Sequence, residues 1–195
     1  MVKKSILKEI DRVIKESWLK NIKSDYHNNH ILKEDSLKNC LYHHIRRKLG
    51  TRFLEEHNLR IYSEFNEADM KGIGRKADIA IVEIGDDYKS HLSDNIRYIH
   101  FIIELKYGSS DKDFFTDINK VKEYINYWQI DCLFYLGFIA EKPYDCPKWL
   151  DKRATNNWAD KKVTVLSANS DFDNDTIQFY VQSCNQYNKD LNNVY

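Results

Sequence analysis

Several features that mark other protein classes are missing from this chain of 195 residues. It has no run of 18 apolar residues, which excludes an ordinary transmembrane helix. Its first residues, Met1 to Ile6, lead into an amphipathic pattern instead of the apolar core of a signal peptide. It also has no internal repeat and no low-complexity tract. These absences predict a soluble, cytoplasmic protein with no membrane partner.

The cysteines and histidines do not have the spacing of a zinc site or a disulfide framework. No C-x-x-C pair occurs, so reduced and mostly buried thiols are the favoured interpretation. Two histidine pairs lack the spaced partners that would complete a tetrahedral metal site, which favours surface or helix-face positions for them. The residues concerned are Cys40, Cys132, Cys146 and Cys184, and His27, His30, His43 and His44.

The formal net charge is zero, so overall charge does not indicate a nucleic-acid-binding protein. The charges are unevenly distributed, however. Residues 1 to 60 carry 14 Lys and Arg against 8 Asp and Glu, a net of +6, and the remaining residues have a net of −6. Arg46, Arg47 and Lys48, with the lysines of the first helix, are therefore candidates for nucleic-acid binding, although a solvated helix face explains them equally well.

Length and a hydrophobic content of 42% predict one α/β domain over residues 1–195. Apolar residues at helical spacing predict helices over residues 4–23, 35–56 and 113–128, with an interruption of the second at Gly50 and a polar loop from Ser24 to His30. The first helix either covers the sheet or pairs with a second copy of the chain in a homodimer. The sequence leaves both open.

Strand-like runs predict a sheet between and after these helices. They lie near residues 59–65, 77–84, 96–107 and 132–139, and shorter runs follow at 163–166 and 176–181. The run at 132–139 is almost continuously apolar, as expected of a central strand that is covered on both faces. The Asn- and Asp-rich segment at 169–175 lacks the spacing of a calcium loop and predicts a solvated loop.

Two neighbouring strands carry the residues that could bind a metal ion or take part in catalysis. Glu104 and Lys106 are two positions apart, so they share one face of their strand. If the strands at 77–84 and 96–107 are antiparallel neighbours, Asp78 comes beside them. Two carboxylates about 5 Å apart repel each other by about 3 kcal/mol at an effective dielectric constant near 20. Their convergence with a lysine on apolar strands therefore suits a Mg²⁺ or Mn²⁺ ion and a water.

Asp78 followed, after a strand-loop-strand interval, by Glu104-Leu105-Lys106 resembles the D...(D/E)xK signature of the PD-(D/E)XK nuclease superfamily. Glu34, at the start of the helix before the sheet, and Glu64, in the first strand, also fit the pattern. The order of elements extends the resemblance over residues 34–140, and leaves out the helix and loop of residues 1–30 and the extension of the sheet at 141–195. Ala77 stands where the family name has a proline.

The resemblance implies a restriction-endonuclease-like fold, in which a mixed central sheet is flanked by helices, here with an extra amphipathic helix at the amino terminus. It also implies a metal-dependent nuclease with DNA as the favoured substrate and RNA as an alternative. Asp78, Glu104 and the carbonyl of Leu105 would hold the metal, and Glu34 or Glu64 would complete its ligands. Lys106 would position the attacking water.

Each site residue also has a plainer interpretation. Glu104 and Lys106 suit an exposed ion pair, and Asp78 suits a strand-entry residue bound by backbone amides. Glu64 has nearby competitors in Glu67 and Asp69, and Glu34 suits the amino terminus of its helix. In the resembled family the helix after the ExK strand often carries a polar residue that faces the site. This makes Lys120 a candidate for phosphate contact, although Asp117 and Lys120 also have the spacing of a local ion pair.

Two alternatives to a nuclease remain open at this stage. One is a catalytically inactive protein of the same fold that binds nucleic acid or a partner protein. The other is an unrelated α/β protein in which the signature is coincidental.

Overall fold

The computed structural model describes residues 2–66, 76–85, 92–108, 111–126, 132–141, 157–160, 162–171 and 176–184. Six strands form one mixed sheet in the order β1-β2-β3-β4-β5-β6. They are β1 (Leu59–Asn66), β2 (Lys76–Ile84), β3 (Ile96–Tyr107), β4 (Leu133–Ala140), β5 (Val163–Asp171) and β6 (Thr176–Ser183). The chain is thus an α/β protein, as the sequence predicts.

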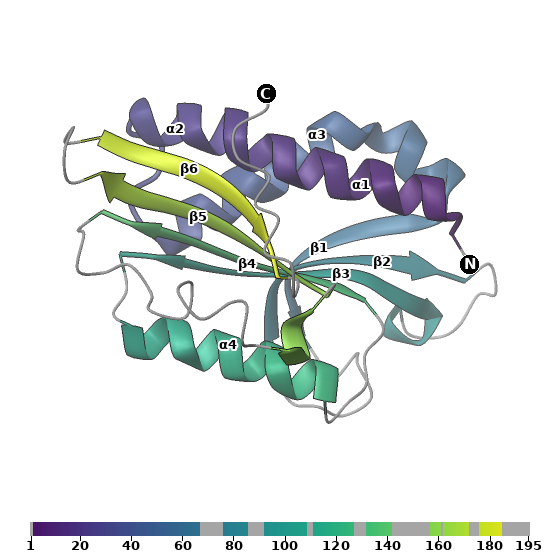
Figure 1. The fold of residues 1–195 in the computed structure, drawn as a ribbon. Coiled ribbons are helices and arrows are strands. Elements are labelled where there is room, and N and C mark those ends of the chain that lie inside the picture. The colour runs from purple at the N-terminus through teal and green to yellow at the C-terminus, as the bar shows by residue number, and fades with distance from the viewer. Residues whose placement is uncertain are drawn as a thin grey trace.

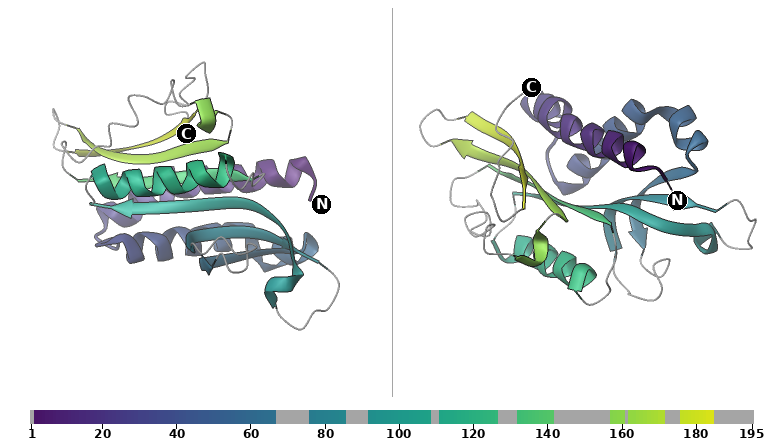
Figure 2. Two further views of the ribbon diagram at one scale, coloured as in Figure 1. Left: turned by 90° about the horizontal axis from the view of Figure 1, so that it is seen from below. Right: turned by 45° about the vertical axis from the view of Figure 1, so that its right-hand side comes forward.

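The helices lie on both faces of this sheet (Figure 1). One face is covered by α1 (Lys4–Glu16), the π-helical segment η1 (Ser17–Ile22), α2 (Lys23–His27) and α3 (Glu34–Glu56). The other face carries α4 (Asp111–Asn126). Two short 3-10 turns, η3 (Leu92–Asn95) and η6 (Asn157–Ala159), complete the described elements. Figure 2 shows the resulting three layers from two further directions.

The pairing of strands confirms the arrangement that the site requires. β1, β2 and β3 are antiparallel neighbours. β3, β4 and β5 are parallel, and β6 returns antiparallel to β5. Because α4 connects the parallel strands β3 and β4, it packs directly over the face of the sheet between them. The strand predicted at 132–139 is β4, which is buried over nearly its whole length between the two helical layers.

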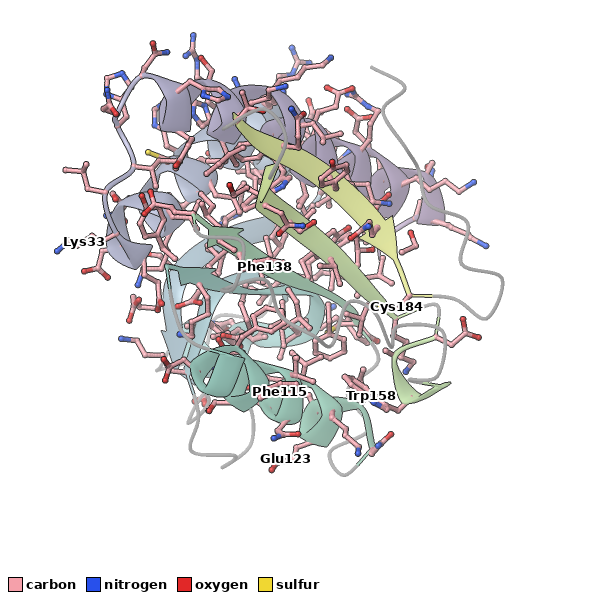
Figure 3. The ribbon with its side chains drawn as sticks, turned by 60° about the vertical axis from the view of Figure 1, so that its left-hand side comes forward. Lys33, Phe115, Glu123, Phe138, Trp158 and Cys184 are labelled. Atoms are coloured by element: carbon pink, nitrogen blue, oxygen red, sulfur yellow. The ribbon has the colours of Figure 1, made fainter. Side chains whose placement is uncertain are left out.

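Two hydrophobic clusters, one on each face, hold the layers together. Under α1, η1 and α3 lies a cluster that includes Ile14, Trp18 and Leu41. Under α4 lies a second cluster that includes Phe114, and the ring of Phe114 packs edge-on against Phe138 of β4 with 4.9 Å between ring centroids. Phe138, labelled in Figure 3, therefore belongs to the α4 side of the sheet.

Most predicted helix and strand positions agree with the structure, and two loop predictions are wrong. The segment predicted as a loop from Ser24 to His30 continues as helix α2 to His27. Tertiary contacts hold this polar segment helical, because Tyr26 packs against Phe179 of β6 and its hydroxyl donates a 3.1 Å hydrogen bond to Glu141.

The predicted interruption of the second helix is confirmed. Within α3, Gly50 has a left-handed backbone conformation, with φ of 75°.

The second wrong prediction concerns the Asn- and Asp-rich segment. Its first residues belong to β5, where Asn169 pairs with Gln178 and Asp171 with Thr176 in the β5–β6 hairpin. Backbone pairing with β6 here outweighs the local preference of these side chains for turns. Residues 172–175 of the same prediction lie outside the described residues.

None of the helices in the described part of the chain has the length and low polarity that a membrane crossing requires.

Gly137 in β4 provides a test of the packing between the sheet and the helical layer above it. A Cβ at this position would lie 2.5 Å from Cδ2 of Leu105, far inside van der Waals contact. We expect Gly137→Ala to lower the free energy of unfolding by about 1–3 kcal/mol, because neighbouring side chains must shift. Urea denaturation measures this change.

The control for Gly137→Ala is the same substitution in a Leu105→Val background, which lacks the clashing methyl group. There the added Cβ should cost much less. An equal cost in both backgrounds would show that the two side chains do not meet as described.

Candidate functional site

Three carboxylates lie in one row across the antiparallel part of the sheet. Ser63 pairs with Ile79 and Phe65 with Ala77, so Glu64 lies opposite Asp78. The same register places Asp78 opposite Glu104, because Ile79 pairs with Ile103. Neighbouring strands are about 4.8 Å apart, so the row brings together residues that are up to 40 positions apart in the sequence.

Asp78 is tied to β3 through the backbone. Its Oδ2 accepts a 2.7 Å hydrogen bond from the backbone N–H of Leu105, and its Oδ1 lies 4.0 Å from the ammonium of Lys38. The alternative interpretation of Asp78, a carboxylate bound by a backbone amide, is therefore correct for one of its oxygens. The other oxygen faces the cluster of charged side chains.

Glu104 is the most deeply buried carboxylate of the row, with 2% of its surface exposed. Lys120 of α4 lies 2.9 Å from its carboxylate and also donates to the backbone carbonyl of Lys76. Burial nevertheless raises the pKa of Glu104 to about 8: the ammonium of Lys120 lowers this pKa, while Asp78 and Asp117 raise it further. The ammonium of Lys120 thus does not fully offset the effect of burial on the pKa of Glu104.

Lys106 lies on the same face as Glu104, one pleat further along β3. Its ammonium donates to both carboxylate oxygens of Glu34 at 3.1 Å and lies 3.4 Å from Oδ2 of Asp117. Burial lowers the pKa of Lys106, but the charges of Asp117, Glu34 and Asp78 outweigh burial and raise it overall. Lys106 is therefore held as an ammonium, and Glu34 contacts it directly from the first residue of α3.

Asp117 is a site residue that the sequence interpretation missed. The spacing of Asp117 and Lys120 suggested a local ion pair, but Lys120 binds Glu104 and Asp117 binds Lys106. Asp117 is 7% exposed, and burial raises its pKa. The available signal was topological: a helix that connects two parallel strands covers one face of them, and here that face carries Glu104 and Lys106.

Glu64 has a backbone conformation that is unusual for its residue type. Its φ of 56° lies in the left-handed region, which costs a non-glycine residue about 1–3 kcal/mol. Its carboxylate binds the ammonium groups of Lys38 and Lys76. Lys38 is only 7% exposed and was also missed, because a lysine on a helix is normally assigned to the solvent face. The competitors Glu67 and Asp69 lie outside the described residues.

Two hollows lead to the cluster from either side of the start of α3. One, of 550 Å³, is lined by Lys33, Asp35, Ser36, Lys38, Asn39 and Glu64. The other, of 250 Å³, is lined by Glu34, Lys106, Asp113, Thr116 and Asp117. The cluster is therefore accessible to small ions and to water at its margins, although Glu104 itself is buried.

The cluster as a whole contains five carboxylates and four lysines. The carboxylates are Glu34, Glu64, Asp78, Glu104 and Asp117, and the lysines are Lys38, Lys76, Lys106 and Lys120. In the described ranges, no group of three or more His, Cys, Asp or Glu side chains is arranged to hold a metal ion.

Two carboxylate oxygens in the cluster nevertheless lack hydrogen bonds. Oε1 of Glu104 and Oδ2 of Asp117 are buried and accept none. Each lies near an ammonium group, at 2.9 and 3.4 Å respectively, but without hydrogen-bond geometry. These oxygens are thus paired with ammonium groups in the absence of a metal, and a hard cation is another ligand that such oxygens accept.

The structure places only one of the four predicted nucleic-acid-binding residues in the cluster. Lys120 lies in the cluster. Arg46, Arg47 and Lys48 are exposed on α3, 12 or more residues beyond Glu34, which corresponds to about 18 Å along a helix. Lys48 also lies 3.8 Å from Glu16 of α1. These three residues are not part of the cluster, and their role in binding stays a prediction.

The described histidines and cysteines form no second centre of this kind. His44 binds Asp25 at 2.7 Å, and Cys40, Cys132 and Cys184 are free thiols. Cys146 lies outside the described residues.

Comparison of the chain with protein-family models, with curated proteins and with solved structures found no match in any of the three. Arguments about function therefore depend on the geometry of the cluster and on the sequence resemblance described above.

The raised pKa of Glu104 predicts how stability depends on pH in the absence of divalent metal. Between pH 4.5, the ordinary pKa of a glutamate, and about pH 8, the folded state holds a proton that the unfolded state has released. The free energy of unfolding should therefore fall as the pH rises through this range. Urea denaturation of the chain in chelator-treated buffers at pH 5, 6, 7 and 8 measures the slope.

Glu104→Gln should flatten this slope, because the glutamine does not titrate. Glu55→Gln, at an exposed position of α3, is the matched control and should leave the slope unchanged. An identical slope in wild type and Glu104→Gln would contradict the assignment of the proton to Glu104.

Proposed function

We propose that this protein is a metal-dependent nuclease with a restriction-endonuclease-like fold, and that DNA is its favoured substrate. The observation that carries the proposal is the row of Glu64, Asp78 and Glu104, with Lys106 on the same face and with Glu104 almost fully buried. The fold assignment is supported by the order of elements, in which a helix, three antiparallel strands, a helix and a parallel strand follow one another.

The donor set suits Mg²⁺ or Mn²⁺. Asp78, Glu104 and the backbone carbonyl of Leu105 would hold the ion, since all three are oxygen donors, and they lie on adjacent residues of β3 or directly across from them. The ion would supply charge stabilisation for the phosphoryl group and acidify a bound water. It would also relieve the burial of charge at Glu104, which is the physical reason for its raised pKa.

Lys106 has the properties of a group that positions water beside a phosphate. Its ammonium is held by Glu34 and Asp117 from two different helices, so its location is fixed before any substrate binds. In this assignment, Glu34 and Asp117 orient Lys106 and do not contact the reacting atoms. The positive charge of Lys106 favours the anionic transition state of phosphodiester hydrolysis.

A second candidate function is a non-catalytic domain of the same fold that binds nucleic acid or a protein. The observation that favours it is the near balance of charge in the cluster, where four lysines bind the five carboxylates and Lys120 occupies the carboxylate of Glu104. In that case the cluster would be a structural network of ion pairs. Metal uptake distinguishes the two candidates.

We expect wild-type protein to bind Mn²⁺ in calorimetric titration, more tightly as the pH rises toward 8, because the proton on Glu104 must leave before the metal binds. Asp78→Ala and Glu104→Gln should abolish this binding. Glu55→Gln again serves as the control. Unchanged binding in Asp78→Ala would exclude the assigned site, and absence of binding in wild type would favour the non-catalytic candidate.

We further expect metal-dependent cleavage of linear, circular, branched or single-stranded DNA or RNA. Asp78→Ala, Glu104→Ala and Lys106→Ala should each lower its rate by at least about a hundredfold. Lys106→Ala should keep the capacity to bind Mn²⁺, which separates a positioning role from a ligand role. Cleavage that persists in all three purified variants would mean that the activity resides elsewhere.

A further inference from the structure

A separate cavity of 800 Å³ lies between α1 and the sheet. Its floor crosses four strands in one band, since Phe101 of β3 pairs with Leu133 of β4, and Thr164 of β5 pairs with Ser183 of β6. The volume is in the range of sites that hold small organic ligands, roughly 300–1,000 Å³. The cavity is therefore large enough for a molecule of that class.

The floor of the cavity is largely apolar, and the buried histidine in its lining already has a partner. The apolar lining comes from Leu7, Phe101, Cys132, Leu133, Val163 and Cys184. His100 is 9% exposed and binds Glu83 at 2.9 Å. Thr164 and Ser183 add two hydroxyl groups to the lining. A ligand on this floor would gain mainly by burying apolar surface.

The rim of the cavity is cationic. One stripe of α1, at intervals of three or four residues, presents Lys4, Leu7, Lys8, Asp11 and Lys15, and Lys162 lies on the opposite side. Four lysines thus face two aspartates, Asp11 and Asp160, around the opening. Asp11 is further neutralised by Lys15, whose ammonium lies 2.8 Å away.

Lys4 and Lys8 are the rim lysines whose positive charge could be paired with a ligand. Both are exposed, they are one helical turn apart on the cavity side of α1, and neither forms an ion pair within the described part of the chain. Two adjacent ammonium groups above an apolar floor complement a molecule with an anionic head and an apolar body.

This cavity is distinct from the carboxylate cluster. The two sites share no lining residue. Cys132, Val163 and Cys184 of the cavity lie at the ends of β4, β5 and β6. Glu104 and Lys106 instead lie beside Leu136 and Phe138, further along β4. In Figure 3, Lys33, which lines a hollow beside the carboxylate cluster, and Cys184, which lines the cavity, lie on opposite sides of the molecule. Occupation of one site therefore does not require the other.

We propose that the cavity under α1 binds a single small amphipathic anion, with one carboxylate, sulfonate or phosphate head between Lys4 and Lys8 and an apolar body over the partly exposed Leu7 and Leu133. The ligand class follows from charge complementarity at the rim and apolar surface at the floor.

Fluorescence titration of the full chain with 8-anilinonaphthalene-1-sulfonate tests the proposal. We expect saturable binding that decanoate displaces and that a neutral decyl maltoside does not. Lys4→Glu/Lys8→Glu should weaken binding of the probe by at least about tenfold. Lys23→Glu/Lys122→Glu makes the same change in net charge at exposed positions of α2 and α4 and should leave binding unchanged.

Two further variants separate the cavity from other sources of the signal. Ser183→Phe should fill part of the cavity and weaken binding without changing the rim charge. Asp78→Ala should bind the probe as wild type does. Circular dichroism and a cooperative urea transition confirm for each variant that the probe does not report on unfolded chain.

Three results would overturn the proposal. The first is equal weakening by the two double-lysine variants, which would mean a general charge effect. The second is displacement by decyl maltoside as effective as that by decanoate. The third is Lys4- and Lys8-dependent sedimentation with phosphatidylglycerol vesicles in the absence of decanoate binding, which would make this surface a membrane contact.

Discussion

The burial of carboxylates in a row across three strands is the constraint on which the rest of the site depends. Glu64, Asp78 and Glu104 lie in one cross-strand register, and the innermost of them is almost fully removed from water. Charges placed so close together in a partly dry environment need opposite charge nearby. The lysines of α3, β2, β3 and α4 supply it. The raised pKa of Glu104 indicates that the lysines compensate only partly for the buried negative charge.

This constraint explains why residues from both helical layers converge at one end of the sheet. α3 begins at Glu34 beside Lys106, and its buried Lys38 reaches Glu64, while α4 contributes Asp117 and Lys120 from the opposite face. Two helices from different layers thus contribute to the positions of the same few side chains. All nine charged residues of the cluster lie on helices or strands, which position side chains more precisely than loops do. The left-handed backbone at Glu64 is a further local cost within the same row.

The sequence predicts much of this arrangement, because the signals that matter are local. Alternating and continuous apolar runs define the strands, and the i, i+2 spacing of Glu104 and Lys106 puts them on one face. The proximity of Asp78 follows from one assumption, antiparallel pairing of β2 with β3, which the structure bears out. By contrast, Lys38 and Asp117 are charged helix residues whose burial arises only from tertiary packing, and local patterns assign such residues to the surface. The continuation of the helix over residues 24–27 also arises from tertiary contacts, since Tyr26 is held by contacts to β6 and Glu141.

In the function we propose, the carboxylates of Asp78 and Glu104 form a site for a divalent cation, and the lysines only partly replace the ion. A crystal structure determined from protein soaked in Mn²⁺, with anomalous scattering recorded for manganese, tests it most directly. We predict an anomalous peak in contact with both Asp78 and Glu104, with the ammonium of Lys120 displaced from Glu104. Anomalous density that is absent from this row, with Lys120 still bound to Glu104, would contradict it.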